Sequence, residues 1–111
     1  MKRGEVWFAD LNPTVGAETA KRRPVLVVSN DANNRAASTV TVLPITSNVV
    51  KVYPFEVALA KGQGGLVKAS KVQAQQIRTI SRERISGKRA GALDADAMAR
   101  VEAAVRLHLS L

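Results

Sequence analysis

The stretch Arg22-Arg23-Pro24-Val25-Leu26-Val27-Val28-Ser29-Asn30 decides how the rest of the chain is arranged. Residues 25–28 are apolar at every position, which is typical of a strand that is buried on both faces. Pro24 fixes its own φ and favours extended geometry in the residue before it. We therefore expect Arg23 at the mouth of this strand, where its planar guanidinium could hold a phosphate or a carboxylate with two hydrogen bonds. The alternative is that Arg23 simply ends the strand in solvent.

The composition fits one domain, residues 1–111, with a core that needs no crosslink. The chain has no cysteine, which excludes disulfides and thiolate metal sites and is compatible with a reducing cytoplasm. It has one histidine, His108, which excludes a multi-histidine metal site. No apolar run approaches the ~20 residues that span a bilayer, and the first residues show no signal-peptide pattern. We therefore expect a cytoplasmic protein that does not enter a membrane.

The positive charge is concentrated in one part of the chain. The formal net charge is +8, and residues 61–89 carry eight Lys and Arg side chains against Glu83 alone. Such a basic stretch favours a polyanionic partner, either nucleic acid or an acidic protein tail. The alternative is a solvated basic surface with only non-specific attraction for anions.

Most of the chain reads as short strands. We expect strands over residues 4–11, 23–29, 39–46 and 53–59, the last with Phe55, Val57 and Leu59 inward. Residues 66–80 are also strand-like, but their apolar phase slips, which indicates two strands or one strand bent by a bulge. Pro44 should break the ladder of the third strand and make its end an edge or a bulge.

The connecting segments are a long loop at 12–22 and a turn at 30–38 with room for one short helical turn. Long loops in compact domains are often functional. Residues 81–93 are basic and glycine-spaced, and we expect a short helical turn followed by a connector.

The chain ends in an expected helix. Asp94 is a candidate N-cap, and Met98, Val101 and Val105 would form one apolar face. His108 falls near that face in the last turn, as a helix-end cation or a packing residue.

An ordered series of short motifs runs along the chain: Gly4-Glu5-Val6-Trp7, Leu11-Asn12-Pro13, Gly16-Ala17-Glu18, Arg23-Pro24-Val25-Leu26-Val27, Pro44-Ile45-Thr46-Ser47 and Gln76-Ile77-Arg78-Thr79-Ile80. Each motif is weak alone, but the set resembles the MazF/PemK family of toxin endoribonucleases over almost the whole chain. The resemblance implies a mainly β (α+β) fold, namely a homodimeric SH3-like β-barrel with a C-terminal helix and a short helical connector. It implies sequence-selective cleavage of single-stranded RNA without metal or other cofactor, and a cognate antitoxin of the MazE type.

The resemblance also assigns the site. Arg23 and Thr46 are its catalytic pair, and it places Gln76 at the RNA. From their positions in the loop and at the strand ends, we also expect Glu18, Lys21, Ser47 and Arg78 to bind RNA. In metal-free cleavage the ribose 2′-OH attacks phosphorus, which leaves a 2′,3′-cyclic phosphate or a 3′-phosphate and a 5′-hydroxyl. Arg23 would stabilise the charge that builds on the phosphoryl oxygens, and Thr46 would fix the position of the phosphate.

The proton acceptor is less well defined. Arginine is a poor general base near neutral pH, because its pKa lies above 12. Glu18 in the loop is the candidate base, with a loop-capping or substrate-contacting role as its alternative. Some relatives carry a histidine where Ala17 stands, or an arginine and an aspartate where Gln73 and Gln75 stand. That version of the acid–base chemistry is absent from this chain.

Two other functions remain open from the sequence. A gyrase-binding toxin of the CcdB type shares the fold, but residues 107–111 do not resemble the tryptophan-containing end of that family. A basic RNA-binding module without catalysis would also suit the charge. The aromatic residues are, however, too few and badly spaced for a base-stacking sheet.

Overall fold

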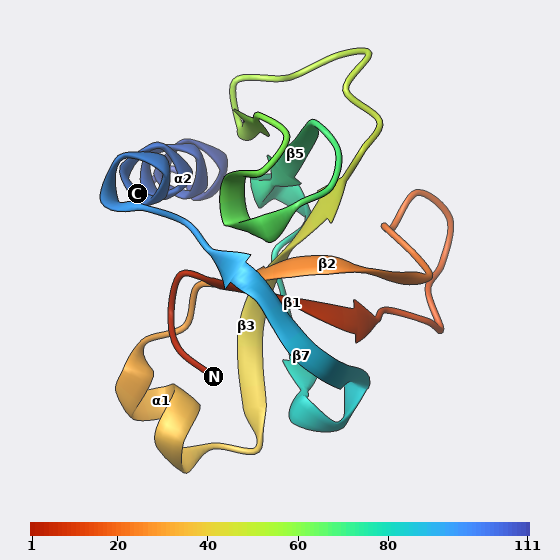
Figure 1. Cartoon of the computed structure of the whole chain (residues 1–111), viewed down its shortest axis with the longest axis vertical. Helices are drawn as coiled ribbons and strands as arrows, with labels where there is room; N and C mark the ends of the chain where they lie inside the picture. The colour runs from red at the N-terminus through yellow and green to blue at the C-terminus, as the bar shows by residue number, and fades with distance from the viewer.

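The computed structural model describes residues 1–111, and antiparallel strands dominate it (Figure 1). The strands are β1 (Glu5–Asp10), β2 (Arg22–Val27), β3 (Thr39–Thr46), β4 (Glu56–Leu59), β5 (Ser70–Gln73), β6 (Arg78–Ser81) and β7 (Ile85–Ala92). The helices are α1 (Asp31–Ala36) and α2 (Ala95–Leu109), with short 3-10 turns η1 (Gln63–Gly65), η2 (Ala74–Gln76) and η3 (Arg82–Arg84). None of the helices is long and apolar enough to cross a membrane.

The seven strands form one sheet in the order β4-β5-β3-β2-β1-β7, and β6 pairs with β3 off this path. No pairing joins β4 to β7, so the sheet is open. The helix α2 packs against β4 and η2, and in Figure 1 it lies to the left of β5. The predicted mainly β fold with a C-terminal helix is confirmed.

β3 is the centre of the sheet because it changes partners along its length. On one side, its residues 42–44 pair with β2. On the other side, its residues 39–42 pair with β6 and its residues 45–46 pair with β5. Pro44 lies where β6 has ended and β5 has not begun. The ladder on that side of β3 is therefore broken at Pro44, as predicted, and the missing N–H falls in the gap between two partners. The strand still continues to Thr46, because Pro44 pairs with Val25 on the other side and residues 45–46 pair with β5.

β2 is buried on both faces, as its sequence predicts. Val25 and Val27 belong to a cluster of 7 buried apolar residues on one face. Leu26 belongs to a cluster of 13 on the other face, which α2 covers with Ala97 and Val101. All three β2 side chains are 0% exposed. Because alternate side chains of β2 belong to different clusters, this one strand contributes to both cores.

The C-terminal helix follows its sequence pattern closely. The Asp94 side chain accepts a hydrogen bond from the Ala97 N–H at 2.8 Å and caps the helix. Val101 is buried, and Met98 and Val105 pack against the larger cluster. His108 is exposed in the last turn, and its ring centroid lies 6.1 Å from that of Phe55.

Two expectations need correction. Residues 85–92 are strand β7 and not a connector, because they pair with β1, a segment some eighty residues away that no local pattern reveals. The fourth strand begins at Glu56, so Phe55 is a half-buried residue before it rather than an inward strand residue. The slip in residues 66–80 is confirmed as two strands, β5 and β6, separated by η2.

Two backbone segments cross without room for side chains at Gly65 and Gly91. A Cβ atom on Gly65 would lie 1.9 Å from the Ala90 carbonyl oxygen, and one on Gly91 would lie 2.6 Å from the carbonyl carbon of Gly64. This crossing holds η1 against β7 and fixes the segment that follows, which forms part of the candidate site.

We expect Gly65→Ala to lower the free energy of unfolding by about 3 kcal/mol or more, since the new methyl group meets backbone. Gly62→Ala is the matched control, because Gly62 also has a positive φ of 95° but open space around its Cβ position. It should lose only about 1–2 kcal/mol. Urea unfolding of both variants measures the difference, and equal losses would contradict the crossing.

Candidate functional site

A hollow of about 190 Å³ lies between the start of β2, the end of β3 and the segment that precedes β5. Its lining includes three cationic side chains and three hydroxyls, namely Arg22, Arg23, Lys68, Thr46, Ser47 and Ser70. The other lining residues are Phe8, Pro24, Ile45, Gly65, Leu66 and Val67. No carboxylate lines the hollow. Such a lining attracts an anion and offers it hydrogen-bond donors.

Arg23 is held in place by the loop and is free at its tip. Its side chain is half-buried, and Nε donates to the Ala20 carbonyl at 2.8 Å. Its terminal nitrogens make no hydrogen bond or ion pair within the chain. Lys21, the residue directly before β2, has a left-handed φ of 71°, which turns the chain into the strand. Arg23 is therefore oriented by its Nε contact, with its remaining donors available to a ligand.

Thr46 is the last residue of β3 and faces the same hollow. Its Oγ1 accepts a hydrogen bond from the Asn48 N–H at 3.2 Å, which leaves the hydroxyl proton free to donate. Ser47 follows it and is exposed. The structure thus brings Arg23 together with Thr46 and Ser47, which follow it by more than twenty residues in the sequence.

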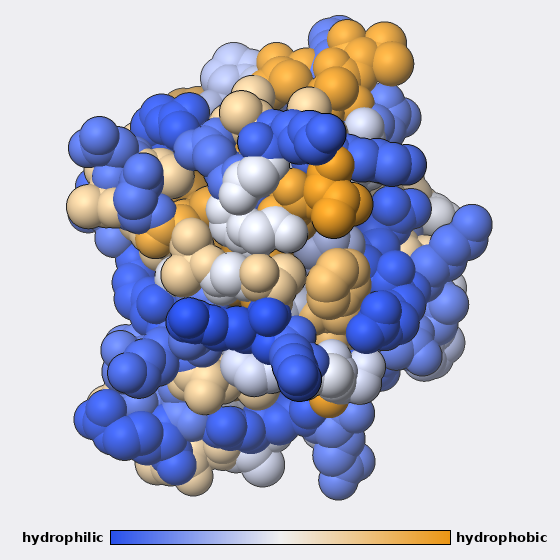
Figure 2. Space-filling model, in the orientation of Figure 1, coloured by the Kyte–Doolittle hydropathy of each residue, from blue (hydrophilic) through white to orange (hydrophobic).

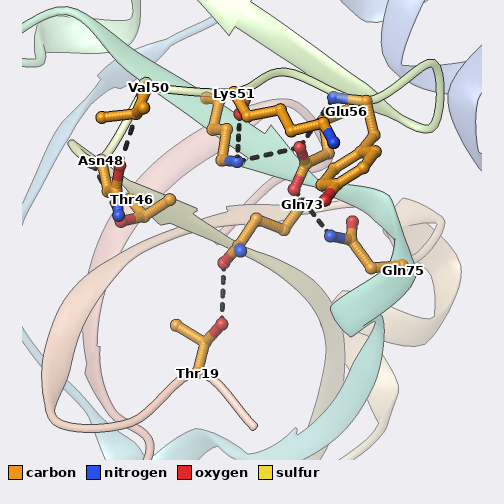
Figure 3. A network of polar contacts seen from close by, with 10 residues as sticks. Thr19, Thr46, Asn48, Val50, Lys51, Glu56, Gln73 and Gln75 are labelled. Atoms are coloured by element: carbon orange, nitrogen blue, oxygen red, sulfur yellow. Dashed lines mark hydrogen bonds and ion pairs between the residues drawn. The ribbon is translucent and has the colours of Figure 1, made fainter. Parts of the chain in front are cut away.

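Gln76 lies outside this hollow and binds the loop between β1 and β2, residues 11–21. Its Oε1 accepts from the Thr19 N–H at 3.2 Å, and its Nε2 donates to the Ala17 carbonyl at 3.2 Å. Gln73 on β5 accepts from the Thr19 hydroxyl at 2.7 Å, as Figure 3 shows. Both glutamines therefore fasten the loop to the sheet, and an RNA contact by Gln76 stays a prediction.

Arg78 also serves the loop, since its guanidinium donates to the Leu11 carbonyl at 3.0 Å. Glu18 is exposed, and its Oε1 accepts from the Val15 N–H at 2.7 Å within the loop. This contact is the loop-capping alternative considered for Glu18. Lys21 is exposed at the end of the loop. None of these three lines the hollow, so their roles at RNA stay predictions.

The basic stretch 61–89 has a different use from the one its charge suggests. Five of its eight cations donate to groups of the protein itself: Lys71, Arg78, Arg82, Arg84 and Arg89. Of the eight cations of this stretch, only Lys68 lines the hollow, beside Arg22 and Arg23 from β2. The cations still add to the positive field of the molecule, but the concentrated charge does not mark the site.

Sequence reasoning missed several lining residues. Phe8, Ser70, Val67 and Lys68 line the hollow, but no motif singles them out. Arg22 adjoins Arg23 in sequence, and its guanidinium lies 4.8 Å from the centroid of the Phe8 ring. In the sequence, the position of Arg22 next to Arg23 was the one signal that Arg22 also lies at the site.

A second hollow is larger, at about 610 Å³, and lies between β3 and α2. It contains Arg3 and Arg106, but also Glu102, which pairs with Arg3 at 2.6 Å. Its charge is therefore partly compensated, and it is the weaker anion site. No group of three or more His, Asp and Glu side chains is arranged to hold a metal ion.

Comparison with known proteins decides the family. A model described as "PemK-like, MazF-like toxin of type II toxin-antitoxin system" matches residues 2–109. The chain belongs to this family. It is 44% identical to endoribonuclease MazF9 of Mycobacterium tuberculosis, over 100% of this chain and 98% of that protein. It is 39% identical to endoribonuclease EndoA of Bacillus subtilis, over 100% and 96%.

Solved structures of family members share the fold. MazF of Deinococcus radiodurans superimposes with a TM-score of 0.86 at 29% identity, over 100% of this chain and 97% of that chain. A mycobacterial endoribonuclease in complex with its cognate antitoxin superimposes with a TM-score of 0.82 at 26% identity, over 100% and 96%. Among MazF-type toxins, this chain therefore keeps the common fold over its full length.

We expect Gln76→Ala to release the 11–21 loop, because the variant loses both contacts to Thr19 and Ala17. The loss of about 1.4 kcal/mol of local stability would speed hydrogen exchange of the Thr19 amide by about tenfold. Gln63→Ala is the matched control, since the Gln63 side chain binds the Ala60 N–H in a different turn. Unchanged exchange at Thr19 would show that the loop is held by other contacts.

Proposed function

We propose that this MazF-type toxin cleaves single-stranded RNA, messenger or other, at selected short sequences without a metal ion. The observation that carries the proposal is the hollow in which Arg23, Thr46 and Ser47 meet two further cations and no carboxylate. A phosphodiester is an anion of matching chemistry, and endoribonuclease relatives at 44% and 39% identity support RNA as the polymer. Because its substrate is cellular RNA, we place the activity in the cytoplasm.

Arg23 is the proposed stabiliser of the transition state. The ribose 2′-OH loses its proton and attacks phosphorus, the bond from phosphorus to the 5′ oxygen breaks, and the 5′ oxygen takes up a proton and leaves as a hydroxyl. Negative charge builds meanwhile on the two non-bridging oxygens. The terminal nitrogens of Arg23 have no protein partner, and Nε is fixed by the Ala20 carbonyl. The guanidinium can thus meet this charge without first breaking an internal contact, which is the advantage of a preorganised site.

Thr46 and Ser47 are the proposed positioning hydroxyls for the phosphate. The Thr46 oxygen already accepts from the Asn48 N–H, so its own proton can point to a phosphate oxygen. A fixed phosphate raises the chance that the 2′-OH attacks in line. Lys68 and Arg22 would hold the neighbouring phosphates by charge.

The proposed general base is Glu18 in the 11–21 loop. Glu18 is the carboxylate that the resemblance offers, but its Oε1 is engaged by the Val15 N–H and the side chain does not line the hollow. We keep Glu18 as a hypothesis that requires the loop to change shape when RNA binds. Cleavage of RNA by Glu18→Gln tests this role.

We also propose a MazE-type antitoxin as partner, whose segment covers the same hollow in a toxin homodimer. Val67 lines the hollow and is 81% exposed, and Val15 on the adjoining loop is 80% exposed. Exposed apolar side chains beside cations suit a segment that carries both apolar side chains and carboxylates. A solved relative in complex with its cognate antitoxin supports this kind of partner.

The cleavage test uses a long single-stranded RNA in EDTA with mapping of the new ends. We expect discrete cuts with 5′-hydroxyl ends for the wild type, and a loss of about 10²–10³ in rate for Arg23→Ala. Arg35→Ala is the matched control, because Arg35 is exposed on α1 away from the hollow. It should cut at the wild-type rate.

Other outcomes assign the alternatives. Full activity in Arg23→Ala would overturn the site, and cutting that needs added metal would overturn metal independence. RNA binding without cutting would favour the RNA-binding module. The absence of both RNA binding and cutting would favour the gyrase-binding toxin. Near-normal cutting by Glu18→Gln would end its candidacy as the base.

The antitoxin proposal predicts that Val67→Asp weakens binding of the neutralising antitoxin by about tenfold or more, because a carboxylate enters an apolar contact beside incoming carboxylates. Leu111→Asp is the matched control, since Leu111 is 84% exposed at the chain end and lies outside the hollow. Calorimetric titration gives both affinities. Equal affinities would place the antitoxin elsewhere.

A further inference from the structure

A buried ion pair stands beside the hollow without lining it. Lys71 Nζ lies 2.9 Å from Glu56 Oε1, and the two side chains are only 10% and 1% exposed. Burying two charges costs desolvation energy, so such a pair is weak support for stability alone. The contacts that Lys71 and Glu56 make with other parts of the chain therefore indicate the role of the pair.

Both members of the pair bind the loop between β3 and β4, residues 47–55. Lys71 Nζ donates to the Lys51 carbonyl at 2.6 Å, and Glu56 Oε1 accepts from the Tyr53 N–H at 3.0 Å. Residues 47–55 contain no helix or strand. Figure 3 shows Lys51 and Glu56 drawn together at one end of this polar network.

Further contacts complete the anchor. Gln75 donates to Glu56 Oε2 at 2.6 Å, so both carboxylate oxygens are satisfied. Lys51 Nζ lies 4.6 Å and Lys71 Nζ 5.9 Å from the centroid of the Tyr53 ring. Burial of the Glu56 carboxyl acts to raise its pKa, but hydrogen bonds from Tyr53, Gln75 and Lys71 outweigh this and lower it below the usual value. The carboxylate therefore stays charged at neutral pH.

The anchored loop begins at the proposed catalytic threonine. Thr46 is the direct cross-strand partner of Lys71 in the β3–β5 ladder. The loop then starts with Ser47, which lines the hollow, and Asn48, whose N–H binds the Thr46 hydroxyl. One end of the loop is thus tied to Thr46, and its second half is tied to Lys71 and Glu56.

The middle of the loop is open to solvent and apolar. Val50 is 95% exposed, and Val49 and Val52 are 39% and 43% exposed. Figure 2 shows apolar surface at the top of the view, where this loop lies in Figure 1. A segment with so much exposed apolar surface has little burial to order it, so its shape depends on the polar anchor.

We infer that Lys71 is a positioning residue for RNA cleavage, which holds the 47–55 loop through the Lys51 carbonyl and the Glu56 carboxylate so that RNA meets a preformed surface. The inference rests on the proposed function. Lys71 does not line the hollow, so it touches neither phosphate nor reacting atoms. Preorganisation of a binding surface acts equally on substrate and transition state, and its loss should raise KM more than it lowers kcat.

The test removes the anchor without leaving a buried charge. Lys71→Met alone strands the Glu56 carboxylate, so the double variant Lys71→Met/Glu56→Met is the main probe, because neither new side chain can bind the loop. We expect hydrogen exchange of the Tyr53 amide to rise by about tenfold and KM for a cleavable RNA by about fivefold or more, with kcat within about twofold. Exchange of the Thr19 amide in the other loop should not change, because Gln73 and Gln76 hold it.

Arg89→Met/Glu5→Met is the matched control. It removes the other ion pair with a mostly buried carboxylate, at 2.8 Å between β7 and β1, which binds neither site loop. It should leave Tyr53 exchange and KM as in the wild type. Wild-type exchange and KM in the Lys71 double variant would overturn the inference, as would an equal rise of KM in the control.

The two proposals fail in distinguishable ways. If the wild type cuts no RNA, the proposed function fails, and RNA affinity then replaces KM as the readout. Faster Tyr53 exchange with weaker RNA binding would support the anchor even then. Unchanged exchange of the Tyr53 amide in the double variant would overturn the inference about Lys71, whether or not the wild type cuts RNA.

Discussion

Burial of β2 on both faces is the constraint on which the rest of the structure depends. Its alternating side chains belong to two separate apolar clusters. A shift of β2 by one residue would therefore move each of these side chains to the opposite face, into the wrong cluster. β3 is held beside it in register and is itself paired on its other side. The ends of these two strands are therefore rigid, and they carry Arg23 and Thr46. A mobile loop would not keep two such side chains at one hollow.

The polar residues of β5 and η2 extend this rigidity to segments without regular structure. Gln73 and Gln76 bind the 11–21 loop, and Lys71 binds the 47–55 loop. Lys71 and Gln73 share one face of β5, because successive side chains of a strand alternate, while Val72 between them enters the core. One short strand thus serves both loops that flank the hollow, through contacts that are separate enough to be broken one at a time.

The cationic side chains of this protein have two roles, which the net charge of +8 does not distinguish. Arginines 78, 82 and 84 donate to backbone carbonyls of loops and helix ends, where no N–H is available. The cations of the hollow face no carboxylate and so remain available to a phosphate. A residue's surroundings, rather than its place in a basic stretch, decide which use it has. This is why β2 contributes more cations to the candidate site than the whole stretch 61–89.

The sequence by itself determined the elements whose signals are local. The apolar run of β2, the alternation of β3 and the capped, periodic α2 were all predictable, and the ordered motifs indicated the family and placed Arg23, Thr46 and Ser47 together. Only the tertiary structure decided that residues 85–92 are a strand, that Pro44 sits in a gap between partners, and that Gln76 and Lys71 hold loops. These features depend on contacts between residues far apart in the chain. Propensity and periodicity report how a segment behaves alone, whereas a strand partner or a buried counter-charge exists only once the chain has folded.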